Sequence, residues 1–255
     1  MKPYILAEGL KYRRTPMKIM TVMMPLVTVL LAAWLTHNFF AVDSYNWWYM
    51  ALYPGFLGIL CSMIGEKEKR KKNYTIWSLP CDMGKIWDAK ILVGVAVSGI
   101  SVVCVVLFTM LIGKGMEIVF HITYIVAPSF GRQILAGIVM WVTTLWQIPF
   151  CLFLIQKMGT FLMLVVHMGC YAVFSVTVSL RPWFALVPGA ITSRLLCPLL
   201  GVLPNGLLLQ PGQMTYSPEL AGMENLLIGI PAVLFWFFLF WLVSRRWFER
   251  QVASE

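Results

Sequence analysis

Residues 91–113 read ILVGVAVSGISVVCVVLFTMLIG, a run without one charged side chain. An α-helix rises about 1.5 Å per residue, so this run is long enough to cross the ~30 Å hydrocarbon core of a bilayer. A charge at the middle of such a helix costs about 2.5–3.5 kcal/mol on insertion, so long charge-free runs are informative. Five more runs of at least twenty residues share the property: 19–42, 44–65, 133–156, 158–180 and 225–244. The sequence therefore predicts an all-α membrane protein with six transmembrane helices.

Composition supports this fold class. Hydrophobic residues make up 60% of the chain and charged residues only 12%, whereas soluble domains carry about 25% charge. We expect residues 1–255 to form a single transmembrane domain without a separate soluble domain. The expected spans are 17–42, 45–64, 91–113, 133–156, 158–180 and 225–244.

The basic residues predict which side of the membrane each segment faces. If both termini lie inside, the inner segments hold every Lys and Arg except Lys114, Arg132, Arg181 and Arg194. Basic residues gather on the cytoplasmic side of membrane proteins, so we expect both termini in the cytoplasm. The same distribution explains the net charge of +9 without nucleic-acid binding.

The N-terminal segment, residues 1–16, precedes the first span. Its apolar residues Leu6 and Leu10 share one helical face, and Glu8 and Lys11 share another. We expect a short amphipathic helix on the inner membrane surface.

The inner segment between the second and third spans is the largest cytoplasmic feature. A charge run over 66–72 is followed by Trp-Ser-Leu-Pro at 77–80. Asp82 can cap a short helix, because its side chain can accept a hydrogen bond from an unpaired backbone N–H. Met83, Ile86 and Trp87 would share one face of that helix, opposite Lys85.

Two outer segments are apolar but do not read as spans. Residues 118–127 are too short to cross, which favours an interfacial or re-entrant helix. Residues 181–224 contain six prolines, and a proline-broken span would leave backbone groups unpaired in lipid. We expect re-entrant half-helices there, joined by a turn at 204–206.

The chain lacks the usual signatures of catalysis and energy coupling. It has no phosphate-binding loop, no HExxH metal motif, no GxSxG elbow and no carboxylate within a span. Its three histidines are isolated, and its six cysteines predict no disulfide framework. We therefore expect no catalytic residue, no metal site and no bound cofactor.

These features together resemble the permease subunits of type-2 ABC exporters. The segment EKEKRKKN at 66–73, followed by WSLP at 77–80 and IWDAK at 86–90, is similar to that family's segment between its second and third spans. Within the family, the chain looks most like the lantibiotic-immunity permeases of the epidermin and mutacin kind. Those proteins remove membrane-active peptide antibiotics from the bacterial cytoplasmic membrane.

The resemblance implies partners and site residues. A separate soluble ATPase dimer would hold ATP and Mg, and a second permease or a second copy of this chain would complete the complex. Residues expected to couple to the ATPase are Glu8, Leu10, Lys11, Asp82, Met83, Lys85, Ile86 and Trp87. Met83, Ile86 and Trp87 could instead face lipid.

The peptide substrate would already lie in the membrane. Residues expected along its path are Gln147, His167, Phe184, Leu195 and Leu199. Two alternatives stay open: a type-2 exporter of another drug, lipid or peptide, and a membrane scaffold or sensor that does not transport.

Overall fold

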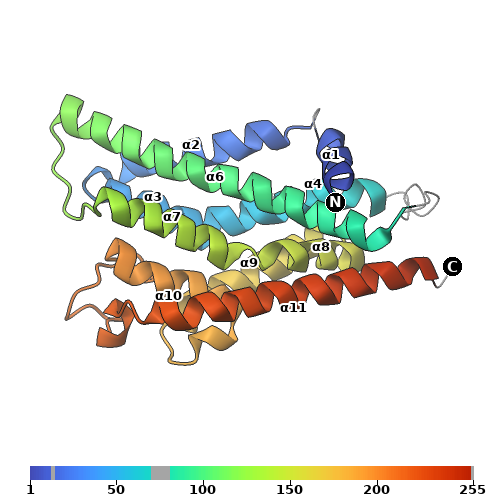
Figure 1. The fold of residues 1–255 in the computed structure, drawn as a ribbon. Helices are drawn as coiled ribbons and strands as arrows, with labels where there is room; N and C mark the ends of the chain where they lie inside the picture. The colour runs from blue at the N-terminus through green and yellow to red at the C-terminus, as the bar shows by residue number, and fades with distance from the viewer. Residues whose placement is uncertain (13–14, 70–80, 254–255) are drawn as a thin grey trace.

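The computed structural model describes residues 1–12, 15–69 and 81–253. Within them the chain forms a bundle of long helices with both termini at the same end (Figure 1). Six helical runs are long and apolar enough to cross a membrane, as the charge-free runs predict. They are Met17–Leu35, His37–Glu66, Met83–Phe120, Phe130–Met158, Thr160–Thr177 and Asn225–Gln251.

The first two spans differ from their expected bounds. Helix α1 (Lys2–Lys11) is followed by α2 (Met17–Leu35), which ends seven residues before position 42. Residues 37–46, around the expected boundary between the first two spans, are helical, and their aromatic and aliphatic side chains, such as Phe40 and Tyr45, are buried against the bundle. The second span thus runs through η1 (His37–Phe39), α3 (Phe40–Trp47), the π-helical η2 (Trp48–Leu52) and α4 (Tyr53–Lys69).

The third span is one helix of 38 residues, α6 (Met83–Phe120). At 1.5 Å per residue it is about 57 Å long, so it extends well beyond the hydrocarbon core. The predicted short helix at 82–90 is its first part rather than a separate element. Asp82 caps it as expected, since its Oδ1 accepts the backbone N–H of Lys85 at 3.1 Å.

The predicted helix over 118–127 is wrong. Helix α6 continues through Phe120 and ends where His121 adopts a left-handed conformation with φ of 52°. The following residues 121–129 contain no helix. The apolar side chains at 118–120 therefore belong to the exposed end of α6.

The fourth span is broken into α7 (Phe130–Thr144) and α8 (Gln147–Met158). Gly159, with φ of +85°, separates α8 from α9 (Thr160–Thr177). Only glycine adopts that backbone conformation without steric cost.

The segment 181–224 contains one true helix rather than two half-helices. After η3 (Phe184–Leu186), helix α10 (Pro188–Leu200) is buried along most of its length. The expected second half-helix is replaced by an irregular stretch with a bridge between Val202 and Leu208, whose turn contains Gly206 at φ of +85°. A 3₁₀ turn, η4 (Pro218–Ala221), leads to α11 (Asn225–Ala253).

Candidate coupling site at the terminal end of the bundle

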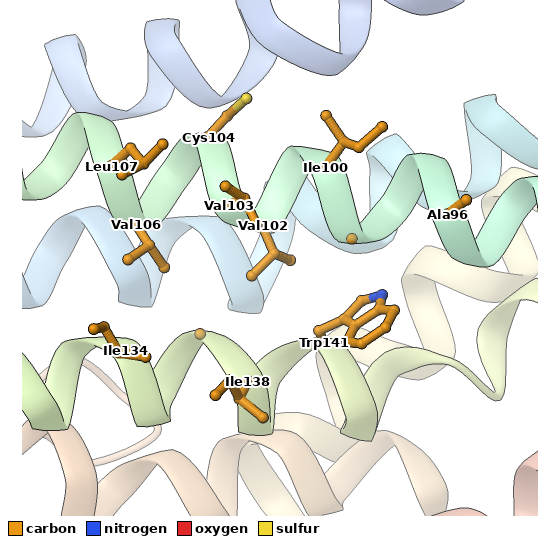
Figure 2. A pocket seen from close by; sticks show the side chains of 12 residues that line it. Ala96, Ile100, Val102, Val103, Cys104, Val106, Leu107, Ile134, Ile138 and Trp141 are labelled. Carbon is orange, nitrogen blue, oxygen red and sulfur yellow. The ribbon is translucent and has the colours of Figure 1, made fainter.

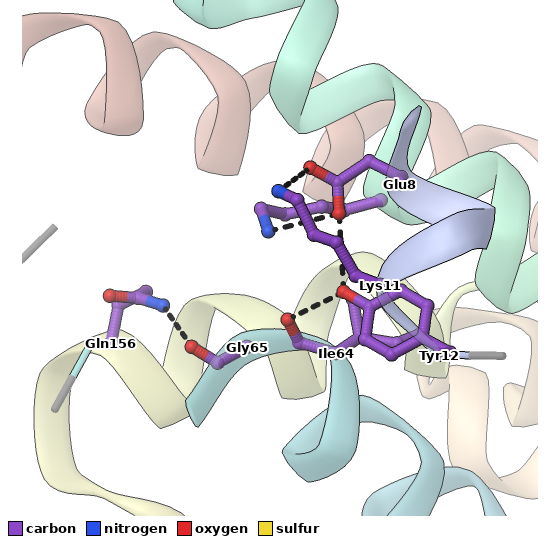
Figure 3. A network of polar contacts seen from close by, with 7 residues as sticks. Glu8, Lys11, Tyr12, Ile64, Gly65 and Gln156 are labelled. Atoms are coloured by element: carbon purple, nitrogen blue, oxygen red, sulfur yellow. Dashed lines mark hydrogen bonds and ion pairs between the residues drawn. The ribbon is translucent and has the colours of Figure 1, made fainter. Parts of the chain in front are cut away.

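Helix α1 is attached to the bundle through a carboxylate. Glu8 is the one buried residue of α1, at 3% exposure. Its Oε2 accepts from the Tyr12 hydroxyl at 3.1 Å and lies 3.4 Å from Lys90 Nζ on α6, while its Oε1 lies 2.5 Å from Lys11 Nζ. Tyr12 also donates to the backbone carbonyl of Ile64 on α4 at 3.1 Å (Figure 3). Four side chains, which we call the Glu8 cluster (Glu8, Lys11, Tyr12 and Lys90), thus join α1 to α4 and α6.

The apolar face of α1 points away from the bundle. Leu6 is 59% exposed and Leu10 is 65% exposed. The sequence correctly separates this face from the Glu8 face, but the polar face is the one that packs on the protein. The apolar face is therefore available to lipid or to a partner at the terminal end of the bundle.

The start of α6 is fastened to α11 by aromatic and polar contacts. The Trp87 ring stacks on Phe248 with centroids 4.7 Å apart, and its Nε1 donates to Ser244 Oγ at 2.9 Å. One turn away, Trp241 Nε1 donates to Asp88 Oδ1 at 2.7 Å. Because Lys90 on the same helix contacts Glu8, the segment 86–90 connects α1 on one side with α11 on the other.

This arrangement corrects the expected role of two residues. Trp87 is fully buried and Ile86 is 7% exposed, so both pack inside this chain rather than on a surface that an ATPase could contact. Helical spacing identifies which side chains lie on the same face of a helix, but it does not identify whether that face contacts the same chain, a partner or lipid.

Apart from the buried Glu8, the other predicted coupling residues remain near the surface. Met83 is half-buried, and Asp82 and Lys85 are exposed and form an ion pair at 3.1 Å. The backbone N–H of Lys85 lowers the pKa of the Asp82 carboxyl by hydrogen bonding to its charged form. The motif at 77–80 and most of the charge run at 66–72 lie outside the residues whose side chains the structure describes.

The end of α4 is tied to the fourth and fifth spans. Lys69 Nζ donates to the carbonyl of Ile155 on α8, and Thr160 on α9 donates to Glu66 Oε2 at 3.0 Å. Gln156 Nε2 donates to the carbonyl of Gly65 at 3.4 Å (Figure 3). The charged end of α4 is thus held by hydrogen bonds to its neighbours.

The five residues expected along a substrate path are buried in the bundle. Gln147 is fully buried, and its side-chain amide nitrogen and oxygen make no hydrogen bond to a described residue. The Nε2 atom of the buried His167 likewise makes no hydrogen bond to a described residue. Phe184, Leu195 and Leu199 pack in the core. None of the five lines the pockets of about 530, 360 and 250 Å³ that the described chain contains.

Sequence reasoning missed the anchor of the far end of the bundle, Arg194. This α10 side chain is 3% exposed. Its Nε donates to Asn225 Oδ1 at 3.1 Å, Nη1 to the Ser179 carbonyl at 3.2 Å and Nη2 to the Glu219 carbonyl at 3.3 Å. A single arginine within the apolar run 188–200 was the available signal, because an unpaired charge there would be costly.

A pocket of about 530 Å³ lies between α6 and α7 and is lined by apolar side chains (Figure 2). Val103 and Leu107 border it on α6, and Ile134 and Ile138 border it on α7. All four are substantially exposed, so the pocket opens sideways toward the surrounding bilayer.

The bundle, its six apolar runs and its polar terminal end define a multi-pass membrane protein of the permease type. Residues 4–175 match the family described as ABC-2 family transporter protein, and the chain belongs to that family. The match includes α1, the Glu8 cluster and α6, and it ends within α9. No curated protein and no solved structure matched the chain.

Proposed function

We propose that this chain is the membrane-spanning subunit of an ATP-driven exporter that removes lantibiotic-type antimicrobial peptides from the bacterial cytoplasmic membrane. Separate ATPase chains would hold ATP and Mg and bind the terminal end of the bundle, which would face the cytoplasm. A second permease or a second copy of this chain would complete the complex. Membership of the ABC-2 family supports the transport class.

The observation that carries the coupling role is the connection of α1, α6 and α11 at one end of the bundle. A partner that pushes on α1 acts on α6 through the Glu8–Lys90 pair, and α6 in turn acts on α11 through Trp87 and Asp88. The ATPase would contact the exposed groups of this end: Leu6 and Leu10 on α1, and Met83 and Lys85 on α6. The basic residues gathered in the inner segments support a cytoplasmic location.

The first experiment is affinity purification of the complex from native membranes, with mass spectrometry of the partners. Lys85→Glu and Leu10→Glu should reduce recovery of the ATPase severalfold, because each places a charge on the expected contact surface. Met214→Glu is the matched control, since Met214 is 94% exposed and lies in the segment 201–217 at the opposite end. If the wild-type chain brings no ATPase in a detergent that preserves other ABC complexes, the scaffold or sensor reading replaces the exporter.

The peptide substrate needs a separate test. Co-expression with its ATPase should raise the inhibitory concentration of lantibiotics for a sensitive cell. A cationic amphipathic peptide partitions into the outer leaflet, so a permease could take it directly from lipid. Unchanged inhibitory concentrations across several such peptides would leave the exporter class intact and favour another drug, lipid or peptide as the substrate.

A further inference from the structure

Two pockets lie in succession along the seam between α6 and α7. The apolar pocket uses Val103 on α6 and Ile134 on α7. A smaller pocket of about 250 Å³ uses Met110, Glu117 and Gln133, which continue the same two helices. Positions seven apart return to the same side of a helix, so 103, 110 and 117 share one face of α6. The linings also come within two residues of each other, at Leu107 and Thr109 on α6 and at Ile134 and Gln133 on α7, so an apolar part is followed directly by a polar part.

The depth of the two parts follows from the charges of α6. Lys90 is buried at the terminal end, and the next charged residue along the helix is Lys114. The intervening charge-free run 91–113 spans about 35 Å, close to the thickness of the hydrocarbon core. The apolar pocket thus lies at the depth of acyl chains. The smaller pocket, which Lys114 and Glu117 border, lies at the headgroup level of the leaflet opposite the termini.

The polar part contains two buried groups without a partner among the described residues. Thr109 is 1% exposed and its Oγ1 makes no hydrogen bond. Gln133 donates through Nε2 to the Pro128 carbonyl at 2.8 Å, but its Oε1 is buried and accepts nothing. A buried polar atom without a partner costs free energy, which a ligand can recover by bonding to it.

The charged side chains that line this part balance each other. Lys114 is its one lining cation and Glu117 its one lining carboxylate, and the two form an ion pair at 2.8 Å. Helix α7 begins at the rim after Ser129, whose side chain makes no capping bond. Free N–H groups and the helix dipole add positive potential there.

We propose that the seam binds a phospholipid of that leaflet. One acyl chain would fill the apolar pocket, the phosphate would lie beside Lys114, Thr109 and the start of α7, and an N–H or O–H of the headgroup would donate to Gln133 Oε1. The open side of the apolar pocket, where Val103 is 55% exposed, gives a lipid lateral access.

The test is native mass spectrometry of the purified full-length protein, titrated with lipids of identical acyl chains. Phosphatidylethanolamine and phosphatidylglycerol carry a headgroup donor, whereas phosphatidylcholine does not. The unaltered protein should bind the two donor lipids about fivefold to tenfold more tightly than phosphatidylcholine, the equivalent of one net hydrogen bond. Equal binding of all three lipids overturns the proposal, and no variant is needed for that comparison.

Variants then locate the site. Gln133→Leu should abolish the preference for donor lipids, and Lys114→Gln should weaken all three. Val103→Trp should reduce lipid retention, whereas Leu111→Trp should not, because Leu111 is 69% exposed on α6 but lines neither pocket. If both tryptophan variants behave alike, or if Val103→Trp instead dissociates a second copy of the chain, the seam does not hold the lipid.

Discussion

Replacing Glu8 by leucine should release α1 from the bundle. The substitution removes the carboxylate that lies 3.4 Å from Lys90 Nζ, in a pair whose side chains are 4% and 2% exposed. At an effective dielectric constant of about 20, unit charges 3.4 Å apart attract by about 5 kcal/mol. Breaking a buried pair from one side costs about 3–5 kcal/mol, because the remaining charge stays buried without that carboxylate beside it. That corresponds to about two to four powers of ten in the docking equilibrium of α1.

The assay is amide hydrogen exchange of residues 2–11 with the protein in lipid nanodiscs. Glu8→Leu should accelerate exchange by a factor in that range. Lys11→Leu is the comparison variant and should accelerate exchange less, because the Lys11 side chain is 39% exposed and water screens its share of the interaction with Glu8.

A double-mutant cycle separates the ion pair from other effects of the substitution. An apolar pair can replace a buried ion pair at little cost. Glu8→Leu combined with Lys90→Leu should therefore recover much of the protection that either single variant loses. Strictly additive losses would refute the reasoning, because they would mean that the two charges do not act on each other.

Three further substitutions test other parts of the structure. Trp87→Ala should lower the melting temperature in detergent, since truncating a buried tryptophan costs about 3–5 kcal/mol. Lys85→Glu should leave the melting temperature unchanged. If Lys85→Glu lowers the melting temperature more than Trp87→Ala does, the buried position of Trp87 is contradicted. Gly94→Ala should destabilise by about 1–2 kcal/mol, because its Cβ would lie 2.8 Å from a buried isoleucine methyl. Gly169→Ala, with open space around it, should be neutral or stabilising by up to about 1 kcal/mol, and melting curves compare the two. Arg194→Lys should expose the segment 201–222 to proteolysis, because lysine keeps the positive charge but lacks the several N–H donors of the guanidinium. Each buried acceptor left without a hydrogen bond costs about 1–3 kcal/mol. Unchanged cleavage would contradict the role of Arg194 in holding this segment.

The spans could be predicted because lipid imposes a local rule. Each charge-free run had to be a helix that satisfies its own backbone hydrogen bonds, and no knowledge of neighbours was required. The same rule fails at the membrane boundary. The charges at 85, 88 and 90 mark one end of the hydrocarbon core, and those at 114 and 117 mark the other. Neither group of charges ends the helix, which explains why α6 extends further at both ends than expected.

The site was less predictable because its contacts join distant parts of the sequence. The sequence places Glu8 beside Lys11 on the polar face of a surface helix, and only the fold brings it to Lys90. The pattern around Trp87 correctly identified an apolar face, but its partner is Phe248 at the other end of the chain. Periodicity reports the direction of a side chain relative to its own helix, whereas the partner depends on tertiary packing.

The described spans differ in continuity, and that difference indicates where the bundle can bend. Helix α6 runs for 38 residues without a break, so a displacement at Lys90 must move its distant half as well. The second span contains the π-helical turn at 48–52, and the fourth is interrupted after Thr144. These two irregularities are adjacent, because the Tyr53 side chain interacts with Thr144, and the Tyr53 hydroxyl donates to the Ser98 carbonyl of α6 at 3.3 Å. Helical irregularities concentrate at functional sites. Here they lie beside α6, the continuous helix that connects the Glu8 cluster with the opposite end of the bundle.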